Sequence, residues 1–370
     1  MKLLVQPNDG ITPLLAAVKS AKKSVDILIF RMDWKELEAA LKAAVGRGVA
    51  VRALIAHTNQ GGAQSLRSLE MRFLEAGVAV MRTADDLVRY HGKMMIIDLR
   101  TLYLLSFNFV HMDIDHSRGF GIVTKSVKVV QEAVKLFEAD TTRQAYTPGL
   151  SSFIVSPANA RKQLSAFIKK ARKQLLIYDP KINDPQIIRL LQDQAKAGVD
   201  VKILGTIAGR GTNLAVTRLT TMRLHTRTII LDGHQAFVGS QSLRKMELDS
   251  RREIGIIVRD AKVVKTLLAT FEKDWEATGF TDSHAAVKED DAEPPPKKMT
   301  QKETRALAKE LPPLAITVKE AIKKAVRKSG TETLDHEEIA STVKSAVKKA
   351  VKEAVKEIAR EEEEEEEKEG

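Results

Sequence analysis

Helical and strand-like patterns of apolar residues alternate near the start of the chain. Apolar positions recur with the period of a helix over residues 11–21 and with the period of a strand over residues 24–30. A second helical pattern follows over 34–45, and a second strand pattern over 49–56. The period changes at glycine-marked turns, which is typical of alternating helices and strands. The pattern therefore predicts an α/β unit.

A later stretch repeats this order of elements. Residues 158–171 have a helical pattern, 174–178 a strand pattern, 184–197 a helical pattern, and 199–204 a strand pattern after Gly198. Such internal similarity indicates a duplication. We therefore predict an α/β fold of two similar lobes, each a mixed sheet flanked by helices, at residues 1–148 and 149–285.

The two halves match most closely around two histidines. The run from His91 to Asp98, HGKMMIID, aligns with the run from His225 to Asp232, HTRTIILD. The alignment continues without a gap and pairs Ser106 with Ser240, Asn108 with Ser242, Asp115 with Asp249, Arg118 with Arg252, and Gly121 with Gly255.

Each of these runs combines groups that suit phosphate chemistry. In an extended chain alternate side chains share a face, so His91 and Lys93 should point the same way. The second copy places Arg227 two residues after His225. Lysine and arginine can hold phosphate oxygens, and histidine titrates near neutral pH. One such motif is weak, but two in register are a strong indication of a phosphate site.

These residues resemble the phospholipase D superfamily, and the resemblance covers residues 1–280. That family is marked by two H-x-K-x-x-x-x-D motifs, each followed by a Gly-Ser-x-Asn-like segment, here residues 105–108 and 239–242. The resemblance implies that both motifs meet in one active site between the lobes. It also implies a two-step mechanism without a metal or cofactor. One histidine attacks phosphorus, and the other protonates the leaving oxygen and then activates water or an alcohol.

The resemblance also implies a set of site residues. The implied catalytic residues are His91, Lys93, Asp98, His225, Arg227, Asp232 and Glu253. The implied ligands of the phosphate oxygens are Ser106, Asn108, Ser240 and Ser242. No metal-binding residues are expected.

One departure from the family pattern concerns the carboxylate that orients each histidine. The second copy has Glu253 for this purpose, but the first copy has Gly119 at the matching position. We therefore expect Glu253 to support His225, while His91 would depend on Asp113 or Asp115. Local chemistry would then make His225 the nucleophile, whereas family precedent would make it the general acid.

Charge and composition narrow the choice of partner. The net charge of +11 divides into +14 for residues 1–285 and −3 for the remainder, which favours an anionic partner such as phospholipid or nucleic acid. Aromatic residues make up only 5% of the chain, so few are available to stack on bases. The chain has no cysteine, which excludes disulfides and thiol catalysis.

Three functions are consistent with these observations. The first is a phosphodiesterase or phosphatidyltransferase that acts on phospholipid through a phosphohistidine. The second is a nuclease of the same superfamily, and the third is a phosphate-binding module without turnover. No apolar stretch approaches the ~20 residues that span a bilayer, and no secretory signal precedes the first repeat. We expect a cytoplasmic protein whose contact with a membrane is at most peripheral, and we leave its oligomeric state open.

The end of the chain has a different composition. Residues 286–313 are charged and contain a run of three prolines, as linkers do. The apolar pattern within residues 314–370 predicts a helical hairpin, and seven consecutive glutamates follow it. The apolar face of the second helix is mostly alanine and valine, so both a membrane surface and a partner helix are open as its contact.

Overall fold

Both predicted α/β repeats are present in the computed structural model, which describes residues 1–57, 63–209 and 214–280. The chain divides into units of residues 1–286 and 287–370, and the described residues all belong to the first unit. The predictions for residues 286–313 and 314–370 lie outside the described residues.

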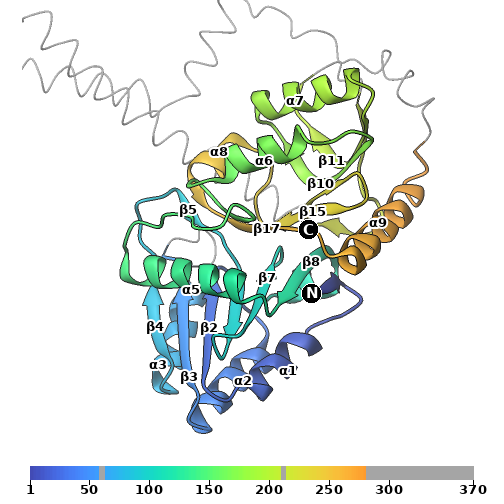
Figure 1. Cartoon of the computed structure of the whole chain (residues 1–370). Coiled ribbons are helices and arrows are strands. Elements are labelled where there is room, and N and C mark those ends of the chain that lie inside the picture. The colour runs from blue at the N-terminus through green and yellow to red at the C-terminus, as the bar shows by residue number, and fades with distance from the viewer. Residues whose placement is uncertain (58–62, 210–213, 281–370) are drawn as a thin grey trace, which may run out of the picture. The chain divides into compact units, whose positions relative to one another are not determined.

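The first lobe contains a mixed sheet with the strand order β1-β8-β7-β6-β2-β3-β4 (Figure 1). Strands β2, β3 and β4 are parallel, and β6, β7, β8 and β1 continue the sheet with antiparallel pairs. The strands are β1 (Lys2–Gln6), β2 (Ser24–Ile29), β3 (Ala50–Ile55), β4 (Ala79–Arg82), β6 (Met94–Ile97), β7 (Thr101–Leu105) and β8 (Ser117–Thr124).

The second lobe repeats this plan in the order β12-β11-β10-β14-β15-β17-β9. Again three strands are parallel and the remaining strands are antiparallel. The strands are β9 (Phe153–Val155), β10 (Gln174–Ile182), β11 (Asp200–Ile207), β12 (Ala215–Thr217), β14 (Arg227–Leu231), β15 (Gln235–Gly239) and β17 (Ile254–Val258). The predicted fold class and the four predicted strands are confirmed.

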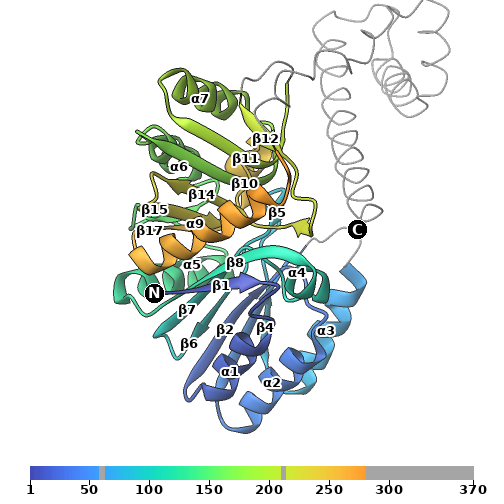
Figure 2. The ribbon, with the colours of Figure 1, turned by 90° about the vertical axis from the view of Figure 1, so that its right-hand side faces the viewer.

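Helices cover the outer face of each sheet, and the four predicted helices are confirmed (Figure 2). These outer helices are α1 (Thr12–Ser20), α2 (Lys35–Gly46), α3 (Ala63–Glu75), α6 (Ala160–Ile168) and α7 (Pro185–Lys196). The sequence explains where α7 starts. The Asp184 carboxylate accepts the N–H groups of Gln186 and Ile187 at the first turn of the helix. Pro185 fits the first helical position because it has no N–H group that would need a partner. Among the described residues no helix is long and apolar enough to cross a bilayer.

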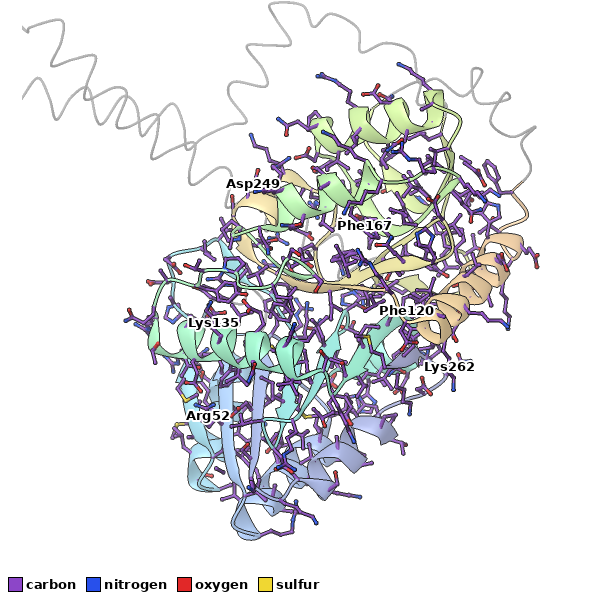
Figure 3. The ribbon with its side chains drawn as sticks, in the orientation of Figure 1. Arg52, Phe120, Lys135, Phe167, Asp249 and Lys262 are labelled. Carbon is purple, nitrogen blue, oxygen red and sulfur yellow. The ribbon has the colours of Figure 1, made fainter. Side chains whose placement is uncertain are left out.

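A central core joins the two lobes. It contains helices α5 (Val127–Thr142) and α9 (Ala261–Glu276), which lie between the sheets, together with residues of both sheets. The Phe120 ring on β8 lies 5.5 Å from that of Tyr178 on β10, and Tyr178 lies 5.0 Å from Phe271 on α9. Figure 3 shows Phe120 at this boundary, whereas Phe167 lies in the separate outer core of the second lobe. The shared core fixes how the lobes face each other.

Two short ribbons also cross the boundary. Strand β5 (Arg89–Tyr90) pairs in parallel with β16 (Arg251–Arg252) of the other lobe. Strand β13 (Arg223–Leu224) pairs in the same way with the start of β8. The same number of residues separates Arg89 from Arg223 and Ser117 from Arg251, so the ribbons are equivalent under the internal duplication.

Candidate active site

Each motif histidine directly follows one of these ribbons and is anchored to the opposite lobe. The His91 N–H donates to the Arg252 carbonyl at 2.8 Å, and the His225 N–H donates to the Arg118 carbonyl at 3.1 Å. Both histidines are buried. The backbone thus holds the two motifs at the boundary between the lobes, in equivalent positions.

His91 lies between a carboxylate and a cation. Its Nδ1 is 3.0 Å from Oε2 of Glu253. Nζ of Lys93 is 2.8 Å from Nε2 and 3.0 Å from Nδ1. Burial, with the neighbouring positive charge of Lys93, holds the pKa of His91 well below its usual range. A carboxylate at Nδ1 favours the tautomer with its proton there, so His91 is neutral with a lone pair on Nε2.

His225 faces a different carboxylate. Its Nε2 lies 3.0 Å from Oδ2 of Asp113, which lies within the short helix α4 (His111–Asp115) of the first lobe. Asp113 also accepts from the Asn108 N–H at 2.7 Å and from Arg223 Nη1 at 2.8 Å. Burial lowers the pKa of His225 to about 4, although the charge of Asp113 acts in the opposite direction.

The carboxylates are therefore exchanged relative to our expectation. Glu253 contacts His91, so the prediction that it supports His225 is wrong, and Asp113 lies beside His225 rather than His91. The reason is that each histidine lies at the boundary and meets the segment that follows the opposite motif. An alignment of the two halves identifies equivalent residues, but it does not identify which residues touch across the boundary.

Gly119, the counterpart of Glu253, has no room for a side chain. A Cβ at this position would lie 2.9 Å from Cδ1 of Phe107, a fully buried ring. Phe107 therefore occupies the space that an equivalent carboxylate would need. Asp113, from the segment after Asn108, supplies the charge to His225 instead.

The two motif serines connect neighbouring strands. Ser106 Oγ accepts the Phe120 N–H at 2.9 Å, and Ser240 Oγ accepts the Ile254 N–H at 3.1 Å. Both serines are fully buried. These hydroxyl groups join strand ends next to the histidines, and their binding of a phosphate stays a prediction.

Asn108 and Ser242 are each oriented by an aspartate. Asn108 Nδ2 donates to Asp113 Oδ2 at 2.8 Å, and Ser242 Oγ donates to Asp179 Oδ1. Burial raises the pKa of Asp179 to about 6. We did not anticipate Asp179 from the sequence, although its place at the end of a predicted strand and before a proline could have indicated it. On the same side, Arg227 Nη1 donates to the His225 carbonyl at 2.8 Å.

Asp98 and Asp232 lie away from the histidines, at the opposite ends of β6 and β14. Asp98 accepts main-chain N–H groups of residues 22–24, and Asp232 accepts those of residues 172–174. Both have a positive φ, of 53° and 49°. The expectation that Asp98 and Asp232 are catalytic is therefore corrected. Each carboxylate joins the turn after its own strand to the connection between the first helix and the first strand of the α/β repeat in its lobe.

Two similar lobes with paired histidine and cation motifs define a phospholipase D-like protein. A family model described as "Cardiolipin synthase, PLD-like domain" matches residues 14–141 and 206–275, more than half of the chain. The chain therefore belongs to this family of the phospholipase D superfamily.

Solved structures show the same fold. Polyphosphate kinase from Porphyromonas gingivalis superposes with a TM-score of 0.62 at 19% identity, over 74% of this chain and 50% of that one. The chain thus spans half the length of this kinase. Phosphatidylserine synthase from Haemophilus influenzae Rd KW20 superposes with a TM-score of 0.54 at 11% identity, over 74% of this chain and 85% of that one. No curated protein sequence matches the chain.

Proposed function

We propose that the protein is a phosphodiesterase or phosphatidyltransferase that works through a phosphohistidine. The observation that carries this proposal is the pair of buried histidines, each beside a carboxylate of the opposite lobe. Lys93 lies beside His91, and the charge of Arg227 acts on both histidines. Such an arrangement provides a nucleophile, an acid–base group and cations for the phosphate oxygens.

His91 is the better candidate for the nucleophile. A phosphate oxygen that binds Lys93 would replace Nε2 as the partner of the ammonium group, which frees the Nε2 lone pair. Nε2 then forms a bond to phosphorus, and the bond from phosphorus to the leaving oxygen breaks. Glu253 stabilises the positive charge that develops on the His91 ring.

His225 is the corresponding acid and base. Asp113 favours the protonated form of the ring, and the incoming phosphate anion raises its pKa, so that His225 takes up a proton from solvent as the substrate binds. In the first step His225 gives a proton to the leaving oxygen. In the second step it takes a proton from water or an alcohol, whose oxygen bonds to phosphorus as the bond to His91 breaks.

Phospholipid is the first substrate to test, because the family model that matches is described as a cardiolipin synthase domain. A nucleic-acid phosphodiester is the second candidate, because residues 1–285 carry a net charge of +14. Phosphatidylglycerol vesicles and a short single-stranded DNA, offered in parallel to the full chain, distinguish the two.

The roles of the histidines can be tested with bis(p-nitrophenyl) phosphate, whose leaving group needs no acid. His225→Ala should release a burst of p-nitrophenolate and trap an acid-labile phosphoenzyme, and His91→Ala should release none. The reverse result would assign the nucleophile to His225. Absence of a burst from the parent protein, with no turnover of any diester, would support a phosphate-binding module without catalysis.

A further inference from the structure

The side-chain carbonyl of Asn108 is a buried acceptor without a partner. Asn108 is 4% exposed, and among the residues that the structure describes none donates a hydrogen bond to its Oδ1. Buried polar atoms in folded proteins are nearly all hydrogen-bonded. An acceptor that the fold buries and does not satisfy indicates a donor on a ligand.

One carboxylate oxygen places this amide beside His225 and fixes its orientation. Oδ2 of Asp113 accepts the Asn108 N–H at 2.7 Å and Nδ2 at 2.8 Å, and the same oxygen lies 3.0 Å from Nε2 of His225. Although burial opposes it, the interactions with His225 and Arg223 hold the pKa of Asp113 below its usual range. The ionised carboxylate only accepts hydrogen bonds, so Nδ2 faces it and Oδ1 is left for another group.

The equivalent position in the second half has no side-chain carbonyl. Ser242 aligns with Asn108 and donates its single hydroxyl proton to Asp179. At this pair of positions the amide carbonyl thus distinguishes the His225 side of the site from the His91 side. In the proposed mechanism the leaving alcohol takes up its proton on the His225 side, and the acceptor alcohol loses its proton there.

A hydroxyl group on the alcohol suits Oδ1 of Asn108 better than an ammonium group does. The positive charges of Arg227 and Arg223 both act on His225 and disfavour a further positive charge there. An ammonium group would also lose its water on entering a buried site. A neutral hydroxyl group supplies the missing hydrogen bond without either cost.

We propose that Asn108 selects the alcohol: its Oδ1 accepts a hydrogen bond from a hydroxyl group on the carbon next to the oxygen that His225 protonates. A neighbouring hydroxyl group fits because Asn108 and His225 share one oxygen of Asp113. The inference rests on the proposed function and defines the class of alcohol, which is a vicinal diol. A polyol headgroup and a ribose with its 2′-hydroxyl group both supply this chemistry.

Calorimetry on the full chain tests the hydroxyl site without any turnover. The ligands are 2-hydroxyethyl, n-propyl and 2-aminoethyl phosphate, which differ only in a terminal hydroxyl, methyl or ammonium group. The 2-hydroxyethyl ester should bind about tenfold more tightly than either of the others, because it alone satisfies the buried carbonyl at no cost in charge. Equal affinity for the 2-hydroxyethyl and n-propyl esters would overturn the proposal. So would tighter binding of the 2-aminoethyl ester.

Two variants remove the carbonyl, Asn108→Ala and Asn108→Ser, and the second introduces the residue of the equivalent position. Each should bind the 2-hydroxyethyl and n-propyl esters within about twofold of each other. A ratio measured within one variant cancels any general loss of affinity for phosphate. Ser242→Ala is the matched control and should keep the ratio of the parent. A parental ratio in both Asn108 variants, or its loss in Ser242→Ala, would overturn the assignment to Asn108.

Turnover separates this inference from the proposed function. The phosphoenzyme formed from bis(p-nitrophenyl) phosphate is offered ethylene glycol and 1-propanol together, and the two transfer products are quantified. The glycol product should exceed the propyl product about tenfold per hydroxyl group, and about equally little preference should remain in Asn108→Ala. Intact discrimination in binding with no turnover would refute the proposed function and leave the hydroxyl site standing. Equal transfer to both alcohols would refute the hydroxyl site and leave the function standing.

Competition against 2-hydroxyethyl phosphate identifies the source of the diol. Vesicles containing phosphatidylglycerol are compared with vesicles containing phosphatidylpropanol, and the dinucleotide UpU is compared with its 2′-deoxy counterpart. The pair in which the hydroxylated member competes about tenfold better gives the natural class of alcohol. If neither hydroxylated member competes better, the hydroxyl site is wrong.

Discussion

Lys93 is a cation with almost no access to solvent, at 1% exposure. Burial lowers its pKa to about 7, and Arg227 adds to this effect while Glu253 and Asp113 oppose it. A lysine with such a pKa loses its charge as the pH rises through neutrality. The free protein therefore has less of the form that can bind a phosphate anion at alkaline pH.

This property predicts the pH dependence of the reaction. For the parent protein, kcat/KM with bis(p-nitrophenyl) phosphate, whose leaving group needs no proton from His225, should fall above pH 7 by about tenfold per pH unit, because kcat/KM reports the ionisation of the free enzyme. Lys93→Arg keeps its charge at all these pH values and should remove the fall up to pH 9. Rates measured from pH 5.5 to 9.5 check this. An unchanged alkaline limb in Lys93→Arg would show that another group titrates.

Gly119 shows how one missing side chain alters the site. The ring of Phe107 packs over it, whereas Gln241 is the residue equivalent to Phe107 in the second half. His225 thus has Asp113, and not a carboxylate at position 119, as its partner because Gly119 and the ring of Phe107 fill that space together.

Substitution of this glycine should be costly. Gly119→Ala places a Cβ at 2.9 Å from Phe107, and we expect unfolding in urea to require about 1–3 kcal/mol less free energy. Gly46→Ala is the control, since a Cβ there meets nothing within 4 Å and alanine favours a helix. Phe107→Leu should restore part of the loss in Gly119→Ala. A Gly119→Ala variant as stable as Gly46→Ala would contradict this packing argument.

At the scale of elements, two buried ion pairs join strands of one lobe to the inner helix of the other. Arg118 at the start of β8 forms a bidentate pair with Asp274 of α9, at 2.7 Å and 2.8 Å. Arg252 of β16 lies 3.1 Å from Asp140 of α5. The two pairs are equivalent under the duplication. Each therefore connects a site ribbon to the shared core.

A double-mutant cycle on Arg118 and Asp274 should show strong coupling. Each single change to alanine leaves a buried charge without its partner, so we expect a loss of about 3–5 kcal/mol from either one. The double variant should lose less than the sum by about 2 kcal/mol or more. The exposed pair of Arg72 and Glu38 provides the reference cycle, with a coupling below about 1 kcal/mol. Equal coupling energies in the two cycles would contradict the proposed structural role of the buried pair.

The sequence predicts long elements and equivalences well, but not contacts across the boundary. The periodic segments at 24–30 and 184–197 became β2 and α7, because each buries an apolar face that its own residues specify. Ribbons such as β5, with two residues, have no pattern of their own and form only when the lobes meet. For the same reason the alignment paired Arg118 with Arg252 and did not identify Asp274 as a partner. The carboxylate of each histidine was missed in the same way.

At the scale of the whole molecule, the two lobes fold around one shared central core. It contains residues from both sheets and from the inner helices, and the last buried apolar side chain in it is Phe271 of α9. Trp275 packs against it, with its ring 5.8 Å from that of Phe271. Both motifs and all three hydrophobic clusters of the described residues thus end before residue 280.

Removal of residues 286–370 should therefore leave the two lobes folded and the site complete. We expect the truncated protein to unfold within about 2 °C of the full chain and to turn over a soluble diester at the same kcat/KM, since no described contact is lost. The control is a chain that stops after Asp260. It lacks α9, including Phe271 and the partner of Arg118, and should fail to give a cooperative transition. Calorimetry and a diester assay on the three proteins check both expectations. A truncation at 285 that melts like the control would mean that residues 286–370 form part of the core.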